Sequence, residues 1–421
     1  MKQKKKYNIG FISTRLAGMD GVSLETRKWA SVFEEKGVSC FYMAGELDHP
    51  KDRSFLVAEA HFKHPKIQEI QQACFSLQTR KLVVTQQIHS MKDYLKEHIY
   101  AFIAKYKIDL LIPENVLAIP MNLPLGLAVT EVISESSLYG IAHHHDMFWE
   151  RKRFLVNGVW EYLNMAFPPH IPTLWHVVIN SSARNQLSLR TGISSELIPN
   201  IMDFENPPPA SDGYSDDIRK DLEFEDDEYF ILQPTRVVRR KGIEHAIELV
   251  NRLGLKAKLV ISHASGDERF GYEKRVRDYA KSMNVKTLFI CDIIQEKRGT
   301  TPDGRKIYSL EDVYPHADLV TYPSSFEGFG NAFLEAIYYR RPLVVNNYSI
   351  YATDIKPKGF NVIEFDGYIT EETIKTTHKI LKNPEIAAEM AEHNYQLAIQ
   401  HYSYAVLRRK LLALILDMFG S

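Results

Sequence analysis

The 421-residue chain has no uncharged apolar run of about 18 residues, the length that an α-helix needs to span a bilayer. A transmembrane helix is therefore not expected, and the content of 45% hydrophobic and 25% charged residues is that of a globular protein. Cysteine is scarce, because Cys40, Cys74 and Cys291 are the only three and lie far apart. An odd number of widely spaced cysteines excludes a disulfide framework or a cysteine-based metal site, and favours reduced thiols in a cytoplasmic compartment.

The chain also lacks an excess of charge of either sign. The formal net charge is only -1, so no global field attracts nucleic acid, and any anion site must be local. The basic start Met1–Lys6 is followed by an apolar stretch, Tyr7–Thr14, that is too short for the hydrophobic region of a signal peptide. We expect a cytoplasmic protein without stable membrane insertion, and leave peripheral membrane contact and oligomeric state open.

The length exceeds the size at which a single hydrophobic core keeps growing, so two domains of about 200 residues each are expected. Short apolar runs alternate with helical patterns in both halves, which is typical of α/β folds with parallel sheets. Tyr7–Thr14, a helix at Ser23–Lys36 and Ser39–Ala44 form a first βαβ unit. The alternation restarts at Tyr229–Pro234, so each half is expected to be doubly wound.

A segment rich in Pro, Ser and Asp, Glu205–Glu228, has no apolar periodicity and is predicted to be the linker. We accordingly expect a first domain over residues 1–204 and a second over 205–400. The last stretch, 401–421, carries apolar residues opposite Arg408, Arg409 and Lys410. It is expected to be a helix that returns to the first domain, and the alternative is an interfacial membrane helix.

The most informative segment is Tyr322–Tyr339, in which two glutamates lie eight positions apart around a glycine-rich turn. Four main-chain N–H groups would open at a helix N-terminus there and favour a diphosphate; they belong to Gly328, Phe329, Gly330 and Asn331. Glu335, about one turn inside the helix, is placed to accept hydrogen bonds from ribose hydroxyls, and Glu327 to bind the transferred sugar. The alternative is an ordinary strand-turn-helix with solvated glutamates.

Several separated motifs resemble those of the family 4 retaining glycosyltransferases, in the expected order. The matching residues are Pro323, Ser324, Glu327, Gly328, Phe329 and Gly330, with Thr235–Gly242 and Ile198–Asp203 upstream. The resemblance spans nearly the whole chain. It implies the GT-B architecture, with two Rossmann-like doubly wound domains facing across a cleft and a C-terminal helix that crosses back to the first. It also implies retention of the anomeric configuration, by front-side attack in which the departing phosphate helps to deprotonate the acceptor hydroxyl.

Two cations in the upstream motif, Arg236 and Lys241, are similar to the family's diphosphate-binding pair. Breaking the glycosidic bond of a nucleotide sugar requires stabilisation of the negative leaving group. The planar fork of Arg and the compact charge of Lys suit this task in different ways. Their alternative role is a basic helix start on the surface. The chain has no Asp-x-Asp sequence, and we predict that no metal or other cofactor is required.

The loop after the first strand holds Gly18 and Gly21, where the family usually has adjacent glycines. The fingerprint Gly-x-Gly-x-x-Gly is absent, so a plain turn is an equal alternative. If the loop belongs to the site, Gly21 faces the donor phosphate and Asp20 the acceptor.

Three adjacent histidines end an expected strand, Tyr139–His143, at the edge where open α/β sheets bind ligands. In the resembled family a His near the donor sugar follows this strand; His145 matches best, and His143 is the second choice. Consecutive strand residues face opposite ways, so only these two could share a zinc ion, an alternative that we leave open beside a purely structural cluster. Acceptor binding is assigned to Asp20, His143, Asp146, Glu150, Arg151 and Arg153, the alternative for the last three being a solvated charged face.

The predicted function is transfer of a hexose, glucose or mannose, from a UDP-, GDP- or ADP-sugar to a small soluble acceptor such as a sugar or sugar acid. The sequence leaves the nucleotide, hexose, acceptor and linkage open. One reason is a polar insertion, Asp292–Lys306, near the position where the resembled family binds the nucleobase. A GT-B-like epimerase or phosphorylase and a non-catalytic sugar-nucleotide sensor are the alternatives. No flanking pattern nominates a lysine for pyridoxal phosphate, and the intact cations and glutamates argue against a decayed site.

Overall fold

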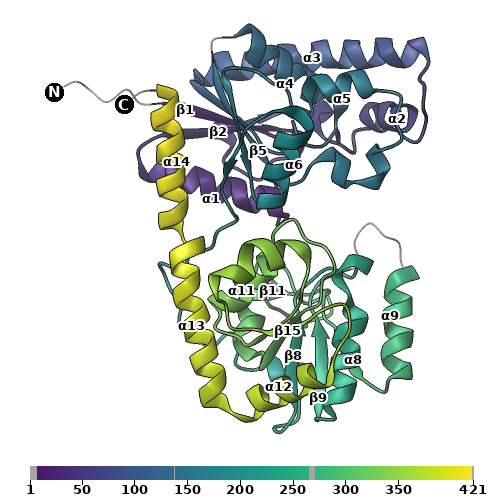
Figure 1. The fold of residues 1–421 in the computed structure, drawn as a ribbon, viewed down its shortest axis with the longest axis vertical. Helices are drawn as coiled ribbons and strands as arrows, with labels where there is room; N and C mark the ends of the chain where they lie inside the picture. Colours follow the sequence, from purple (N-terminus) through teal and green to yellow (C-terminus); the bar gives the residue numbers. More distant parts are fainter. Residues whose placement is uncertain (1–6, 137, 265–270, 420–421) are drawn as a thin grey trace, which may run out of the picture. The chain divides into compact units, whose positions relative to one another are not determined.

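A computed structural model describes residues 7–136, 138–264 and 271–419, so the basic start Met1–Lys6 lies outside the described residues. The chain divides into two compact units, the first of residues 1–200 with 407–421 and the second of residues 201–406. Each unit contains one parallel sheet covered by helices (Figure 1).

The first unit is built on a seven-stranded parallel sheet with the order β3-β2-β1-β4-β5-β6-β7. Its strands are β1 (Asn8–Ile12), β2 (Ser39–Ala44), β3 (Ser54–Leu56), β4 (Leu110–Pro113), β5 (Tyr139–His144), β6 (Leu174–Val178) and β7 (Glu196–Leu197). The order reverses direction beside β1, so β4 and β5 lie next to each other and end at the same edge. Ligands bind at such edges of open α/β sheets.

Helices cover both faces of this sheet. They are α1 (Gly21–Glu35), α2 (Pro65–Cys74), α3 (Leu82–Tyr106), α4 (Leu123–Glu135), α5 (Trp160–Ala166) and α6 (Ser181–Thr191). Figure 1 shows α1 on one face and α3 and α4, which pack on each other, on the opposite face. In α1, Trp29 and Phe33 are buried on the side of the helix that packs on the sheet, as expected of an amphipathic helix, and Glu25 is a buried charged residue among them.

The last helix, α14 (Tyr404–Phe419), joins the first unit from Leu407 onward. Leu407, Leu411, Leu414 and Met418 are buried, and Arg408 forms an ion pair with Glu35 of α1 at 3.2 Å. The expected return of the C-terminal helix is therefore confirmed. Its apolar face is covered by protein, unlike that of an interfacial helix, and no helix among the described residues has the length and apolar character to span a bilayer.

The second unit contains a six-stranded parallel sheet with the order β10-β9-β8-β13-β14-β15. Its strands are β8 (Tyr229–Gln233), β9 (Ala257–Ile261), β10 (Lys286–Phe289), β13 (Leu319–Tyr322), β14 (Leu343–Asn346) and β15 (Ile363–Phe365). A separate antiparallel hairpin pairs β11 (Gly299–Thr300) with β12 (Lys306–Ile307). The predicted doubly wound α/β class is confirmed in both units.

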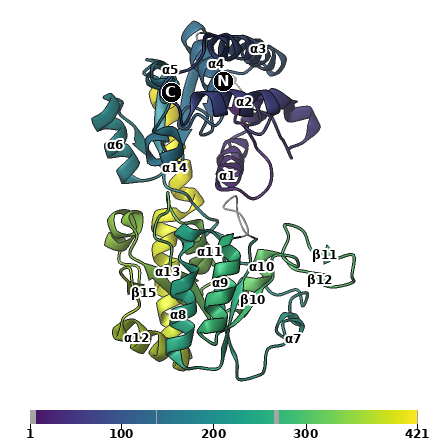
Figure 2. The same cartoon turned by 90° about the vertical axis from the view of Figure 1, so that its right-hand side faces the viewer.

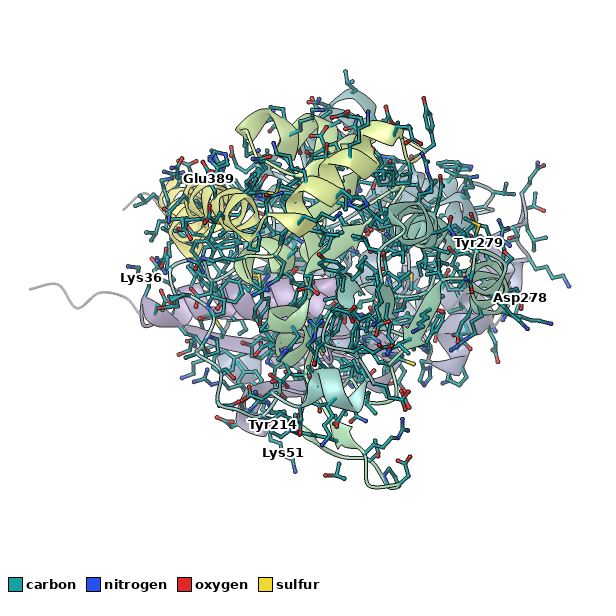
Figure 3. The ribbon with its side chains drawn as sticks, turned by 90° about the horizontal axis from the view of Figure 1, so that it is seen from below. Lys36, Lys51, Tyr214, Asp278, Tyr279 and Glu389 are labelled. Carbon is teal, nitrogen blue, oxygen red and sulfur yellow. The ribbon has the colours of Figure 1, made fainter. Side chains whose placement is uncertain are left out.

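The helices of the second unit are α7 (Ile218–Asp221), α8 (Ile243–Leu253), α9 (Gly271–Ser282), α10 (Leu310–Val313), α11 (Asn331–Tyr338), α12 (Glu371–Lys382) and α13 (Pro384–Tyr402). Figure 2 shows α8 and α9 side by side, and both contribute to one hydrophobic core with α12. In α9, Val276 and Ala280 are buried while Asp278 is exposed (Figure 3). This is the expected pattern of a helix packed on a sheet by one face.

The segment predicted to be a linker, 205–228, is instead part of the second unit. Ile218 is fully buried and Leu222 retains 7% exposure, so the segment is anchored in the core. Lys306 of the hairpin donates to both carboxylate oxygens of Asp217, at 2.7 and 2.8 Å. The abundance of Pro and Asp concealed these anchors, so composition alone did not show that the segment is packed on the second unit.

Candidate active site

Two loops that carry the predicted donor motifs are in direct contact within the second unit. The Ser325 N–H donates to the carbonyl of Arg240 at 2.8 Å, and the Arg240 guanidinium donates to the carbonyl of Phe326 at 3.0 Å. Gly242 has φ +58°, and a Cβ there would overlap the carbonyl oxygen of Pro323. Only glycine combines this conformation with so close an approach, so the residue fixes the contact between the loops.

Lys241 and Glu327 form a buried ion pair at this contact. Their side chains retain only 10% and 9% exposure, and Arg240 donates to the second carboxylate oxygen at 2.6 Å. Burial by itself raises the pKa of Glu327, but the Lys241 and Arg240 charges outweigh it and hold the pKa below its usual range. The ammonium of Lys241 also lies 5.3 Å from the ring centroid of Tyr322. Glu327 is thus held as a carboxylate between two cations.

Arg236 lies at the same end of the sheet but is exposed, and its side chain has no hydrogen bond or ion pair among the described residues. His263 follows β9 at its carboxyl end and is close enough for the Arg236 charge to affect its pKa. Burial lowers the pKa of His263 to about 4, and the Arg236 and Lys241 charges add to that effect. Sequence reasoning missed His263, although its position directly after a buried strand was a usable signal.

The glycine-rich turn leads into α11 through Gly330, whose φ is +133°. A Cβ at this position would lie 2.5 Å from the hydroxyl oxygen of Tyr348, which itself donates to the carbonyl of Phe329 at 2.8 Å. The Phe329 side chain is buried against Tyr402, so only its main chain is available to a ligand. Gly328 and Asn331 are half-buried on either side of this turn.

Glu335, the second glutamate of the motif, lies on α11 and is half-buried. One of its carboxylate oxygens accepts a hydrogen bond from the Tyr314 hydroxyl at 2.8 Å. Tyr314 is fully buried and stacks on Tyr339, with ring centroids 4.9 Å apart. Burial, together with the Glu335 charge, raises the pKa of Tyr314, so the phenol stays a donor and orients the carboxylate.

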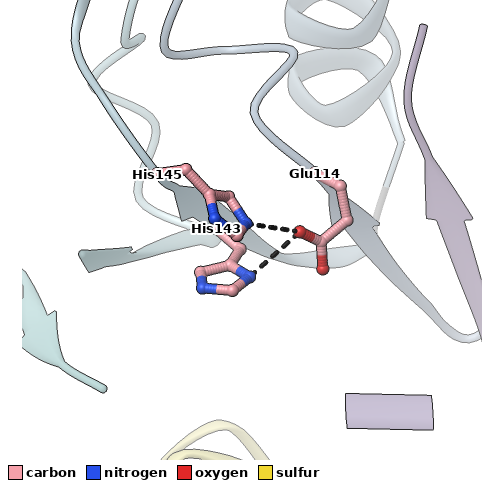
Figure 4. Close-up of side chains that lie close together, drawn as sticks. All are labelled: Glu114, His143 and His145. Atoms are coloured by element: carbon pink, nitrogen blue, oxygen red, sulfur yellow. Dashed lines mark hydrogen bonds and ion pairs between the residues drawn. The ribbon is translucent and has the colours of Figure 1, made fainter. Parts of the chain in front are cut away.

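In the first unit, the neighbouring strands β4 and β5 bring a glutamate and two histidines together. Glu114 and His143 are partners in a parallel bridge, and His145 lies on the same face because side chains alternate along extended chain. Glu114 Oε2 is 2.9 Å from His143 Nδ1 and 3.4 Å from His145 Nε2 (Figure 4). Trp29 of α1 stacks on His143, with ring centroids 4.2 Å apart.

This cluster, Glu114 with His143 and His145, is almost completely enclosed. Burial raises the pKa of Glu114 to about 7 and lowers that of His143 to about 4. Glu114 Oε1 and His143 Nε2 are buried without a hydrogen-bond partner in the described part of the chain. Because the three donor atoms lie within 4.8 Å of one another, the cluster has the spacing to hold a metal ion, and the zinc alternative stays open.

Comparison with known proteins shows the family of the chain. The family described as "Glycosyl transferases group 1" matches residues 304–397, the stretch that contains Glu327 and Glu335. A mannosylglucosylglycerate synthase of Thermotoga maritima is 30% identical over 440 residues, covering 94% of this chain and 96% of that relative. The chain belongs to glycosyltransferase family 4.

Two further comparisons agree with this assignment. A mannosylglucosylglycerate synthase of Petrotoga mobilis is 28% identical over 444 residues, covering 98% of both chains. The crystal structure of a glycosyltransferase from Rickettsia africae superposes on the present structure with a TM-score of 0.70. The two sequences are 13% identical, and the match covers 98% of both chains. The second match shows a shared fold, and the predicted GT-B architecture is confirmed.

Within this family 4 glycosyltransferase, most of the predicted acceptor residues make local contacts. Asp146 accepts from Asn115 Nδ2 at 2.9 Å and pairs with Arg151, while the Asn115 amide oxygen accepts from the His145 N–H at 2.9 Å. Glu150 accepts from the Met147 N–H at 2.8 Å, and burial raises its pKa. These bonds hold the backbone of the segment after β5 in place.

The remaining predicted residues are Arg153, in the same segment after β5, and Asp20 and Gly21 at the start of α1. Arg153 is exposed, and its guanidinium lies 4.7 Å from the ring centroid of Phe154. Asp20 caps α1 by accepting from the N–H groups of Val22 at 3.1 Å and Ser23 at 3.3 Å. Gly21, the first residue of that helix, is exposed.

A cavity of about 410 Å³ opens beside the segment after β5. Trp149 and Trp160 line it together with Arg190 of α6, whose guanidinium lies 5.3 Å from the Trp149 ring centroid. The indole N–H of Trp149 is buried and has no acceptor within the described residues. Flat aromatic surfaces beside a cation and a spare donor suit a sugar that carries a carboxylate.

Proposed function

We propose that this enzyme transfers a mannosyl group, with retention of configuration and without a metal, from a nucleotide diphosphate sugar to a hydroxyl of a small sugar acid. The observation that carries the proposal is the contact between the Arg236–Gly242 loop and the Pro323–Gly330 loop. This contact gathers Lys241, Glu327 and the start of α11 at one place in the second unit. A cation and a helix N-terminus so arranged suit a diphosphate.

The donor diphosphate is assigned to Arg236, Lys241 and the main-chain N–H groups that open α11. Arg236 has a side chain that no described residue engages, so its full charge is available for a leaving phosphate. Glu335, oriented by Tyr314, is assigned to the ribose hydroxyls. With this set of cations the leaving group is stabilised by protein charges, and the proposal needs no divalent ion.

Retention is proposed to occur by front-side attack, since no free carboxylate nucleophile lies at this point among the described residues of the second unit. Glu327 is engaged by two cations on its two oxygens, which lowers its nucleophilicity and suits it to bind sugar hydroxyls. Retaining glycosidases instead place two carboxyl groups about 5 Å apart across the bond. The departing phosphate is therefore the base that accepts the acceptor proton.

The acceptor proposal draws on the relatives, whose name describes a product that joins mannose, glucose and glycerate. Adding mannose to glucosylglycerate forms such a product, and glucosylglycerate is a sugar acid. The cavity with Trp149, Trp160 and Arg190 supports this choice, because an aromatic face can pack on a pyranose and a guanidinium can bind a carboxylate.

The deciding experiment incubates the purified enzyme with GDP-mannose, UDP-glucose or ADP-glucose, each with glucosylglycerate and with excess EDTA. Product is followed by anomeric proton NMR, which reports the linkage and the configuration. We expect an α-mannoside from an α-linked donor, formed equally with and without EDTA. An inverted product, a strict need for Mg²⁺ or Mn²⁺, or donor consumption that ignores the acceptor would each contradict one part of the proposal.

A further inference from the structure

A buried glutamate outside the donor motifs contacts the histidine assigned to the sugar. The Glu114 carboxylate reaches both His143 and His145, yet the three side chains differ in access to solvent. Glu114 and His143 retain 0% and 1% exposure, whereas His145 retains 10%. Glu114 and His143 are therefore closed off from solvent, and His145 is the residue of the cluster that a ligand can contact.

We propose that Glu114 is a positioning residue for His145: its carboxylate accepts the Nε2–H of that ring and leaves the Nδ1 lone pair to accept a hydrogen bond from a sugar hydroxyl. The inference rests on the proposed function and on the match of His145 to the family's histidine near the donor sugar. Glu114 does not touch the sugar itself, and acts through the ring. This is the arrangement by which a buried carboxylate fixes a histidine tautomer in other enzymes.

The hydrogen-bonding capacities of the groups support this tautomer. A neutral imidazole carries one N–H and one lone pair, and an ionised carboxylate can only accept. Both rings must then direct an N–H at Glu114, His143 through Nδ1 and His145 through Nε2. For His143 this leaves Nε2 without a proton, and that atom has no partner among the described residues. If His143 Nε2 carried the proton instead, a buried N–H would lack an acceptor, which costs more free energy than a buried lone pair without a donor.

Other elements supply the surroundings of the cluster. Glu25 of α1 is buried and forms an ion pair with Lys28 at 2.5 Å. His144 faces the other side of the sheet and bonds to His176 at 2.9 Å, so it does not compete for Glu114. Asp146, next to His145, is held by Asn115. No cation among the described residues bonds to Glu114, so the two rings are its hydrogen-bond donors.

The first test reads the tautomer directly and needs no activity. The complete protein is labelled with ¹⁵N-histidine, and the His145 signals are identified by their loss in His145→Gln. At a pH above the Glu114 pKa, we expect a protonated Nε2 and an unprotonated Nδ1 at His145. In Glu114→Met the ring should lose this preference and the two nitrogen shifts should converge. A protonated Nδ1 in the unaltered protein, or unchanged shifts in Glu114→Met, would overturn the proposal.

The second test separates positioning from folding. We expect Glu114→Met to lower kcat by about 100-fold, as loss of a residue that orients a functional histidine does, with the donor KM unchanged. Glu114→Gln should recover most of that loss, because its amide oxygen can still accept from His145. The control is Glu228→Met, which removes an equally buried carboxylate while its partner Lys258 keeps a bond to the Leu222 carbonyl at 3.2 Å.

The outcomes distinguish this inference from the proposed function. If Glu228→Met lowers kcat as much as Glu114→Met, or if Glu114→Gln is as poor as Glu114→Met, the role is structural and the proposal is wrong. If Glu114→Met fails to fold, the tautomer measured in Glu114→Gln decides, with the same preference expected as in the unaltered protein. Absence of mannosyl transfer contradicts the proposed function and leaves the tautomer measurement standing.

Discussion

Lys241 and Glu327 form an ion pair in which both side chains are about nine-tenths buried. Removing one partner leaves a buried charge, which costs about 3–5 kcal/mol when no other group replaces it. We predict that Lys241→Met lowers the free energy of unfolding by about 3 kcal/mol, because Arg240 still pairs with Glu327, and abolishes most activity. Urea denaturation and a transfer assay measure the two effects.

A double variant separates the structural role of this pair from its chemical role. Lys241→Met with Glu327→Leu removes both charges, and replacing a buried pair by apolar side chains is often close to neutral for stability. We expect the double variant to regain most of the lost stability and none of the lost activity. Recovery of turnover would show that the pair is only a folding device.

The two ends of α8 offer a matched pair of glycines. Gly242 and Gly254 have nearly equal φ values, +58° and +59°, but a Cβ at Gly242 would meet Pro323 whereas a Cβ at Gly254 has open space. Gly254→Ala should therefore cost only about 1 kcal/mol, the strain of a left-handed residue. Gly242→Ala adds a clash that separates the two donor loops, and we predict a larger loss of stability together with weakened nucleotide-sugar binding by calorimetry. Equal effects of the two substitutions would contradict this account of the loop contact.

Arg236 is predicted to act on the donor and not on the fold. Its exposed guanidinium has no partner among the described residues, so Arg236→Ala should leave the melting temperature unchanged. Loss of a charge-assisted hydrogen bond costs about 1.5–3 kcal/mol, which corresponds to a fall in kcat/KM of about 10- to 150-fold. Lys281→Ala, at an exposed position of α9, is the control and should change neither quantity. An Arg236→Ala enzyme with full kcat/KM would remove this residue from the donor site.

Much of the donor side could be predicted because its determinants are local in sequence. The glycine turn and α11 follow directly from the pattern Tyr322–Tyr339, and β8 with its cation loop from Tyr229–Gly242. The structure adds the contact between these two segments. Among the consecutive basic residues Arg239, Arg240 and Lys241, the pattern did not tell which face Glu327, because a short 3-10 turn sets their directions.

The role of Glu114 could not be predicted in the same way. Its contact with His143 exists because β4 lies beside β5 in the sheet, and strand order is a property of the whole unit. The alternation rule did predict that His143 and His145 share a face. Similarly, Tyr314 meets Glu335 from a separate helical turn 21 residues away, and no periodicity within either segment indicates that pair.

The buried histidines predict how stability changes with acid. Burial lowers the pKa of His176 to about 4, against 6.5 for the free side chain. Between these values the unfolded chain binds a proton that the folded protein does not, so the free energy of unfolding falls as the pH drops from about 6.5 to about 4. His143 acts in the same direction, and Glu114, whose pKa is raised to about 7, acts in the opposite direction between about 7 and 4.5.

The histidines whose pKa burial lowers, among them His143, His176 and His263, outnumber the glutamates whose pKa burial raises, Glu114 and Glu150. We therefore predict a net loss of stability over this range, with each imidazole contributing on the order of 1–3 kcal/mol. Urea unfolding at a series of pH values measures the slope. His176→Leu removes one of these imidazoles and should flatten the slope by that amount, even if the absolute stability also changes. His393→Leu replaces an exposed histidine of α13 and should keep the original slope. If both variants keep the original slope, then His176 accepts its proton as readily in the folded protein as in the unfolded chain, and burial does not control its ionisation.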